Sequence, residues 1–229
     1  MKRINLTDPE FSDRFDYFLE EVKENENQKL DEEIRILAIL SVLTATQSID
    51  LYKIKLEEAL QMGYSPITVK EMLYQATDYL GIGKVYSFIL TTNEVMKENG
   101  ISLPLEGQET TTIENRLEKG VAVQVEIFGI HMQEAWKSGE INYWLASNCF
   151  GDYYTRTGLD LKQRELITFC FLMAQGGCEP QLIAHASGNM NIGNDAMFLK
   201  KVISQCLPYI GYPRSLNALN CIEQASKNK

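Results

Sequence analysis

The sequence contains little that would suit a membrane or a nucleic acid. No apolar run reaches the roughly 20 residues of a transmembrane helix, so we expect a buried helix in the apolar run ILAILSVL at residues 36–43. The first residues, MKRINLTDPEF, lack the apolar stretch of a signal peptide. The formal charge of −9 disfavours binding to a phosphate backbone. These absences predict a cytoplasmic protein that binds neither membranes nor nucleic acids.

Metal and cofactor motifs are also missing. The chain has five cysteines, but none are spaced C-x-x-C as in zinc or dithiol sites. It has only two histidines, His131 and His185, and neither lies in a cluster of metal-ligand type. No glycine-rich nucleotide loop follows a strand. We therefore expect reduced thiols, no metal and no organic cofactor.

Strand signals are scarce, whereas helical periodicity recurs along all 229 residues. At 45% apolar and 23% charged residues the composition is that of a globular protein. The pattern predicts an all-α fold, with a linker at residues 101–111 and a loop at residues 151–160. The expected helices cover residues 7–24, 30–46, 49–62, 65–81, 84–98, 113–128, 132–137, 141–150, 161–175, 179–190, 195–209 and 214–225.

An internal repeat becomes visible when the sequence is shifted by 130 residues. The segment TDYLGIGKVYSFI, residues 77–89, then aligns with LPYIGYPRSLNAL, residues 207–219. The glycine that ends the expected helix at Gly63 aligns with Gly193. We therefore predict two tandem copies of a helical-hairpin unit. The first covers residues 1–105 and the second residues 112–229.

Only the second unit carries a set of reactive side chains: Glu165, Cys178 and His185. The first unit has at the aligned positions Arg35, Ser48 and Lys55. We therefore expect any chemistry to reside in the second unit, with the first unit degenerate.

The reactive side chains lie on two expected helices, 161–175 and 179–190, joined by the tight turn Gly176-Gly177. Such a hairpin runs antiparallel, so the rise of 1.5 Å per residue places Glu165 within about one turn of His185. Four residues at spacings of three and four share one face of the second helix: Cys178, Gln181, His185 and Asn189.

These residue types suit acid–base or thiol chemistry. Histidine is the usual proton-transfer group near neutral pH, and Glu165 could orient His185 or raise its pKa. Cys178 is expected in the first turn of a helix, where the helix dipole lowers the pKa of a thiol. Purely structural alternatives remain: a packed histidine, a solvated glutamate and a small buried cysteine. His131 is expected to be structural.

Three segments of the second unit resemble the carboxymuconolactone decarboxylase family, within the wider alkylhydroperoxidase D-like superfamily. They are residues 150–169 (FGDYYTRTGLDLKQRELITF), 176–185 (GGCEPQLIAH) and 207–219 (LPYIGYPRSLNAL). The resemblance implies an orthogonal all-α bundle, no cofactor, and a homo-oligomer such as a trimer or a hexamer. A weaker match at residues 30–89 suggests a tandem form.

The superfamily contains two chemistries. Its peroxidase-type members use a glutamate, a C-x-x-C pair and a histidine, and Glu165, Cys178 and His185 match this pattern. The position of the second cysteine is occupied by Gln181, so a dithiol cycle is not expected here. An antioxidant peroxidase that uses Cys178 alone and an external thiol remains an alternative.

Decarboxylase-type members remove CO2 from a lactone acid. By this resemblance His185 would supply the proton and Glu165 would set its state. Arg156 and Arg164 are candidates to bind the substrate carboxylate, unless they form surface salt bridges. Gln181 and Asn189 are the other expected substrate contacts. We favour this decarboxylase-like reading; a non-catalytic oligomeric binding protein is a third possibility.

Overall fold

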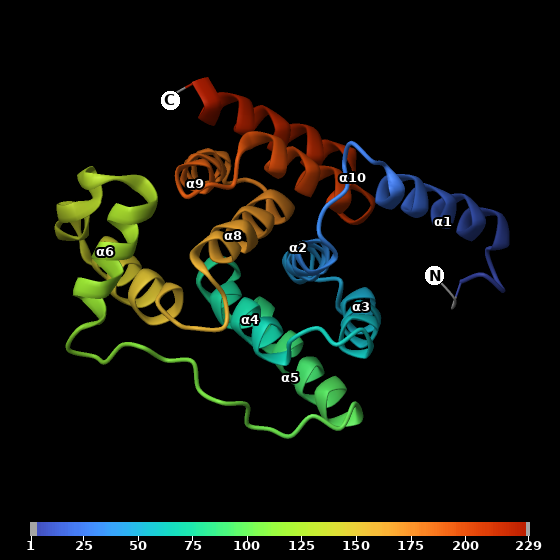
Figure 1. Ribbon diagram of the computed structural model, residues 1–229, viewed down its shortest axis with the longest axis horizontal. Helices are drawn as coiled ribbons and strands as arrows, with labels where there is room; N and C mark the ends of the chain where they lie inside the picture. The colour runs from blue at the N-terminus through green and yellow to red at the C-terminus, as the bar shows by residue number, and fades with distance from the viewer. Residues whose placement is uncertain (1–3, 228–229) are drawn as a thin grey trace.

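The computed structural model describes residues 4–227, and every regular element in that range is a helix. The all-α prediction is confirmed. Figure 1 shows α2 and α8 near the middle of the molecule, α1 projecting at one end and α6 at the other. The elements in chain order are α1 (Pro9–Glu24), α2 (Glu32–Ala45), α3 (Ile49–Gln61), α4 (Pro66–Leu80), α5 (Ile82–Glu98), α6 (Arg116–Phe128), η1 (Ile130–Ser138), α7 (Glu140–Trp144), η2 (Leu145–Tyr154), α8 (Leu161–Gln175), α9 (Glu179–Asn191) and α10 (Ala196–Lys227).

Side-chain caps fix where several helices begin. The Asp31 carboxylate accepts hydrogen bonds from the first backbone N–H groups of α2, and Ser65 does the same for α4. At the start of α8, Asp160 and Gln163 bond each other's backbone in a reciprocal capping box. These contacts satisfy N–H groups that the helix itself leaves unpaired. They set the start of α8, which carries Glu165.

The observed helices depart from the expected ones mainly around residues 145–154. The sequence predicts a loop from residue 151, but the helix continues to Tyr154 as a π-helix, η2. Residues 130–138 form a 3-10 helix. The two helices expected near the C-terminus are joined into α10 through a break at Gly211, which has φ 77°. The π-helix matters most, because such segments are frequent at functional sites.

The helices follow the 130-residue register of the sequence repeat. α3 begins at Ile49 and α9 at Glu179, while α4 begins at Pro66 and α10 at Ala196. Gly81, between α4 and α5, has φ 80° and corresponds to the break at Gly211. A positive φ at these two positions favours glycine. The tandem duplication itself, with units 1–105 and 112–229, stays a prediction.

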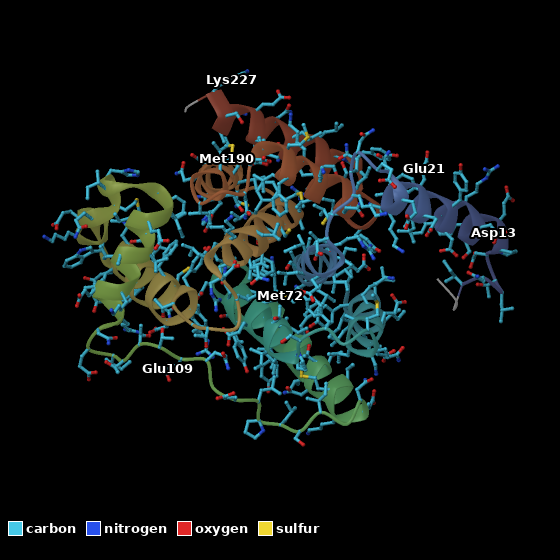
Figure 2. The ribbon with its side chains drawn as sticks, viewed as in Figure 1. Asp13, Glu21, Met72, Glu109, Met190 and Lys227 are labelled. Atoms are coloured by element: carbon cyan, nitrogen blue, oxygen red, sulfur yellow. The ribbon has the colours of Figure 1, made fainter. Side chains whose placement is uncertain are left out.

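The first half of the chain (residues 4–105) and the second half (residues 112–227) share one apolar core. α2 packs against α8, and α10 contacts both of these helices. Buried side chains of the first half, such as Leu40 and Met72, belong to the same cluster as Phe169 and Phe171 of the second. Figure 2 shows Met72 amid packed side chains, while Asp13 lies on the projecting helix α1. Within residues 4–227, no helix has the length and apolar character to cross a membrane.

A second, smaller cluster joins α6 to η2. Its buried members are Ile127, Cys149, Phe150 and Tyr154. The two helices approach closely because glycine stands at their contact: a Cβ on Gly120 would collide with the carbonyl oxygen of Ala146 and lie 2.7 Å from the backbone nitrogen of Gly151. This close contact places α6 over the site described below.

We expect Gly120→Ala to lower the free energy of unfolding by about 3 kcal/mol, because the added methyl group meets backbone atoms that cannot rotate away. Gly83→Ala is the matched control, since Gly83 lies in α5 with no atom within 4 Å of an added Cβ. That substitution should stabilise the protein by about 0.5 to 1 kcal/mol through helix propensity. Urea denaturation measures both; equal stability of the two variants would contradict the close contact.

Candidate active site

The centre of the site is a buried pair of Glu165 on α8 and His185 on α9. The Nδ1 atom of His185 lies 2.9 Å from one carboxylate oxygen of Glu165 and 3.1 Å from the other. Glu165 has no exposed surface, and the His185 side chain is 11% exposed. Asn189 ties the two helices together by donating to the backbone carbonyls of Glu165 and His185. The structure thus brings together the two residues that the hairpin geometry predicts to be neighbours.

Aromatic rings enclose His185 on two sides. The ring of Phe128 on α6 and the ring of Tyr79 on α4 stand edge-on to the imidazole, with centroids 5.3 and 5.7 Å away. Gly188 allows this approach: an added Cβ would lie 2.9 Å from both Phe128 and Glu165. The imidazole of His185 therefore lies between α4, α6, α8 and α9, with aromatic rings on two sides.

Hydroxyl groups reach Glu165 from the opposite side of the carboxylate. The Tyr154 hydroxyl donates to Glu165 over 2.7 Å. It also lies 2.7 Å from the Thr168 hydroxyl and 3.0 Å from the Tyr79 hydroxyl. Gln75 donates its amide to the Thr168 oxygen. Glu165 therefore sits between an imidazole and a network of neutral donors.

The contact with the Glu165 carboxylate decides which nitrogen of the His185 ring is available to exchange a proton. A carboxylate offers only acceptors, so Nδ1 of His185 carries a hydrogen and Nε2 is the atom left to exchange a proton. A histidine oriented in this way by a carboxylate is the arrangement used by general acids and bases. Within residues 4–227, no group of three or more His, Cys, Asp and Glu side chains is arranged to hold a metal ion.

Arg156 and Arg164 are engaged elsewhere. The Glu71 carboxylate on α4 accepts hydrogen bonds from both guanidinium groups, at 2.9 to 3.1 Å. Arg164 is fully buried and also donates to Gln75. Burial lowers the pKa of Arg164, whereas the hydrogen bond to Glu71 raises the pKa of Arg156. The structure does not place either group against His185, and Arg164 is not the surface residue that a simple salt bridge would imply.

The two other expected substrate contacts are divided between surface and core. Gln181 is exposed on α9. Asn189 is fully buried, and its carbonyl oxygen accepts from the amide of Asn194. Its amide hydrogens go to two backbone carbonyls, as described above. Asn189 therefore holds the helix pair together, and its polar atoms are already engaged within the protein.

Cys178 lies at the N-terminal cap of α9, partly exposed. Its Sγ donates to the carbonyl of Leu172 over 3.4 Å. Burial raises the pKa of the Cys178 thiol, opposed by the hydrogen bond from Gln175; Glu179 also raises it, and Arg214 lowers it. The expectation that the helix start would lower this pKa is therefore wrong, because loss of solvent outweighs the dipole.

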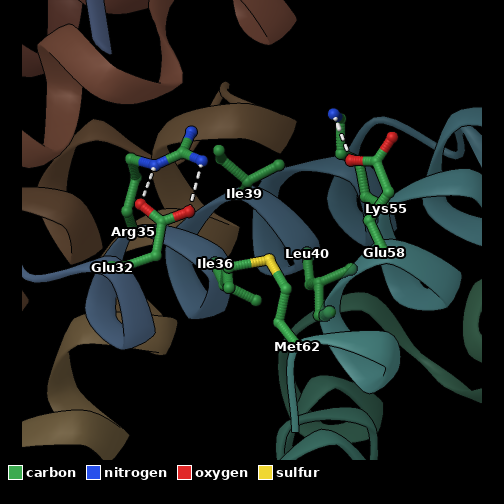
Figure 3. Close-up of a pocket in the computed structure, with 9 residues that line it drawn as sticks. Glu32, Arg35, Ile36, Ile39, Leu40, Lys55, Glu58 and Met62 are labelled. Carbon is green, nitrogen blue, oxygen red and sulfur yellow. Dashed lines mark hydrogen bonds and ion pairs between the residues drawn. The ribbon is translucent and has the colours of Figure 1, made fainter. Parts of the chain in front are cut away.

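The corresponding place in the first half contains no acid–base pair (Figure 3). Arg35 and Lys55 stand there at the positions aligned with Glu165 and His185. Arg35 bonds the carboxylate of Glu32 over 2.8 Å, and Lys55 bonds that of Glu58 over 2.7 Å. Each cation is thus neutralised by its own helix. That the first unit is a degenerate copy of the second stays a prediction.

Sequence reasoning missed four residues that surround the pair: Gln75, Tyr79, Tyr154 and Thr168. Gln75 and Tyr79 come from the first half, about 90 residues before Glu165. Tyr154 lies in a segment for which the sequence predicts a loop. Thr168 offers a signal that could have been used, because it lies three residues after Glu165 and so on the same helix face.

Comparison with known families identifies the second half. Residues 140–224, from α7 to α10, match the model of the carboxymuconolactone decarboxylase family. The match contains Glu165, Cys178 and His185, and it confirms the resemblance inferred from the sequence. The chain therefore carries a domain of the carboxymuconolactone decarboxylase family. No curated protein matches the chain.

One further titratable group lies behind the hydroxyl network. Burial raises the pKa of Asp78 to about 8; a hydrogen bond with Cys149 opposes this shift and the Asp152 carboxylate adds to it. One Asp78 carboxyl oxygen has no hydrogen-bond partner. The Cys149 thiol in turn donates to the Tyr79 hydroxyl over 3.6 Å. A pKa of about 8 favours the protonated form of Asp78 at pH 7.

We expect Asp78 to make stability depend on pH. Its folded pKa lies above the unfolded value of 3.8, so its contribution is fully present below about pH 4 and is lost as pH rises towards 8. Relative to Asp78→Asn, the wild type should lose about 1 kcal/mol per pH unit across that window. Denaturation at several pH values measures the difference. Asp13→Asn, on exposed α1, controls for loss of a charge, and a pH-independent difference at Asp78 would contradict the burial.

Proposed function

We propose that the protein is a cofactor-free enzyme of the carboxymuconolactone decarboxylase type, which acts on a small carboxylated lactone by acid–base chemistry. His185 is the proton-transfer group and Glu165 holds its ring. The observation that carries the proposal is the contact between these two buried side chains. The Nδ1 atom of His185 bonds the carboxylate of Glu165, so that Nε2 is the ring nitrogen that can exchange a proton with a substrate. The family match over residues 140–224 supports the same class of reaction.

The proposed reaction needs only a proton donor. The bond between the substrate carbon and its carboxylate breaks, the electron pair passes into the conjugated lactone, and CO2 leaves. The Nε2–H of His185 then transfers its proton to the carbon that received the electrons, and solvent restores the proton to the ring. Glu165 stabilises the protonated ring by its negative charge.

The two arginines assigned to the substrate carboxylate fit this role less well than the sequence suggests. Each of them already shares the Glu71 carboxylate, and Arg164 has no exposed surface. Releasing Arg164 would leave a buried charge without a partner, which is costly. We therefore propose that the protonated His185 is the cation closest to the substrate. Arg164 then serves to join α4 to α8, and Arg156 joins α4 to the loop that precedes α8.

Thiol chemistry is the weaker alternative. Cys178 is partly exposed, as a peroxide-reactive thiol needs to be. However, burial raises its pKa, which reduces the fraction of thiolate at neutral pH. Seven residues separate Cys178 from His185 along α9, a rise of about 10 Å, so the imidazole is not placed to deprotonate the thiol.

We further propose that the chain acts as a homo-oligomer, such as the trimer or hexamer implied by the family. The support is an apolar surface at the projecting end of the molecule. Leu6, Phe11 and Tyr17 are 93%, 58% and 68% exposed. Helices in proteins gain most of their stability from the packing of an apolar face, so we expect a partner surface to cover this face of α1.

We expect His185→Gln to reduce turnover of a carboxylated lactone by at least about 100-fold, because the proton donor is lost. Cys178→Ser should retain the activity. Release of CO2, together with deuterium incorporation from D2O, would follow the reaction across a panel of lactone acids. His131→Gln is the control for removing a histidine.

Two outcomes would contradict the proposal. If Cys178→Ser alone abolishes activity, and the wild type consumes peroxide with dithiothreitol, the protein is a one-cysteine peroxidase. If lactone acids bind to the wild type and to His185→Gln equally well and neither protein turns them over, it is a binding protein.

A further inference from the structure

We infer that Tyr154, supported by Tyr79 of the first half, is a positioning residue that stabilises the Glu165 carboxylate beside His185 and thereby sets the pH at which the Glu165–His185 pair takes up a proton. The inference rests on the proposed role of His185 as proton donor, but its main test does not require turnover. It assigns a function to the first half of the chain, which carries no acid–base pair of its own.

Gln75, Thr168, Tyr79 and Tyr154 form a hydrogen-bond network in which each group donates to the one nearer Glu165. Gln75 uses its amide hydrogens on the carbonyl of Arg164 and the oxygen of Thr168, so the Thr168 hydroxyl hydrogen is free for Tyr154. Tyr154 donates its single hydrogen to Glu165 and so accepts from the Tyr79 hydroxyl.

The same direction continues at the far end of the network. The Cys149 thiol donates to the Tyr79 hydroxyl, which leaves the Tyr79 hydrogen for Tyr154. Each donor in such a chain polarises the next, so the last hydrogen bond, to the carboxylate, is the strongest. The network therefore favours a carboxylate at Glu165 over a carboxylic acid.

Three elements place titratable side chains around Glu165, and a fourth contributes apolar side chains. Tyr79 comes from α4, Cys149 and Tyr154 from η2, and His185 from α9; α6 contributes the apolar Ile127 and Phe128. Burial raises the pKa of Tyr79, Tyr154 and Cys149 well above their ordinary values, so all three stay protonated donors at neutral pH. Asp78 on α4 lies one contact further out and reaches this network through Cys149.

Loss of the Tyr154 donor has an effect of definite sign. The fully deprotonated pair, with a carboxylate and a neutral ring, depends most on Tyr154, because a buried carboxylate without donors is unfavourable. A pair that holds one proton depends on Tyr154 less, whichever of the two groups carries that proton. Removing the hydroxyl therefore favours the protonated pair and moves its titration to higher pH.

The test is a titration of the His185 ring by NMR in Tyr154→Phe. A His131→Gln background leaves His185 as the only histidine signal of the chain. We expect the midpoint to rise by about one pH unit, as for the loss of one hydrogen bond to a charged group. Tyr79→Phe, which removes the second donor, should shift it in the same direction by a smaller amount.

Tyr153→Phe is the matched control, since it removes a neighbouring hydroxyl that makes no hydrogen bond to this network. It should leave the midpoint unchanged. An unchanged or lower midpoint in Tyr154→Phe would overturn the inference, and so would an equal shift in Tyr153→Phe. If Tyr154→Phe does not fold, Tyr79→Phe decides by the same criterion.

The two proposals fail in different ways. A raised midpoint in Tyr154→Phe without turnover of any lactone acid would support the positioning role and refute the proposed reaction. Turnover that depends on His185, with an unchanged midpoint in Tyr154→Phe, would support the proposed reaction and refute the positioning role of Tyr154. If a substrate is turned over, the rate should fall to half of its maximum at a higher pH in Tyr154→Phe than in the wild type. This shift should match the shift of the NMR midpoint.

Discussion

Two ionisable side chains of opposite type are buried side by side on α8, and the rest of the structure must supply polar partners for both. Arg164 and Glu165 are consecutive residues with no exposed surface. The helix directs them to different sides, because neighbours in a helix are about 100° apart. Arg164 meets Glu71 on α4, and Glu165 meets His185 on α9. A buried charge without a partner costs several kcal/mol, so the positions of α4 and α9 against α8 are tightly constrained.

This constraint explains what the first half contributes. α4 supplies Glu71 and Gln75 to Arg164, and one turn later it supplies Tyr79 to the network on Glu165. The first half has no acid–base pair in its own equivalent place, where Arg35 and Lys55 are paired with glutamates. Its helix α4 nevertheless provides contacts without which both buried charges would lose partners. The first half therefore contributes to the site of the second half through α4.

Local periodicity was enough to predict the helices and the contact between Glu165 and His185, because both residues lie on one short hairpin. It could not predict the partners of Arg164 or the role of Tyr79, because these contacts join residues 75 to 93 positions apart. Tyr154 was missed for another reason: a π-helix has no simple apolar period, so residues 151–154 read as a loop. The direction of the Cys178 pKa was predicted wrongly, since sequence shows the helix start but not the burial that outweighs it.

The separation of imidazole and thiol favours acid–base chemistry over redox chemistry at this site. A cysteine peroxidase needs a base or a cation close to its sulfur, so that thiolate is present at neutral pH. Here the polar groups that would serve as base are directed at each other: Glu165 binds Nδ1, and Tyr154 binds Glu165. Cys178 instead donates to a backbone carbonyl, an interaction that favours the neutral thiol. The Glu165–His185 pair and the Cys178 thiol therefore have separate hydrogen-bond partners, and the proposal of acid–base chemistry rests on this arrangement.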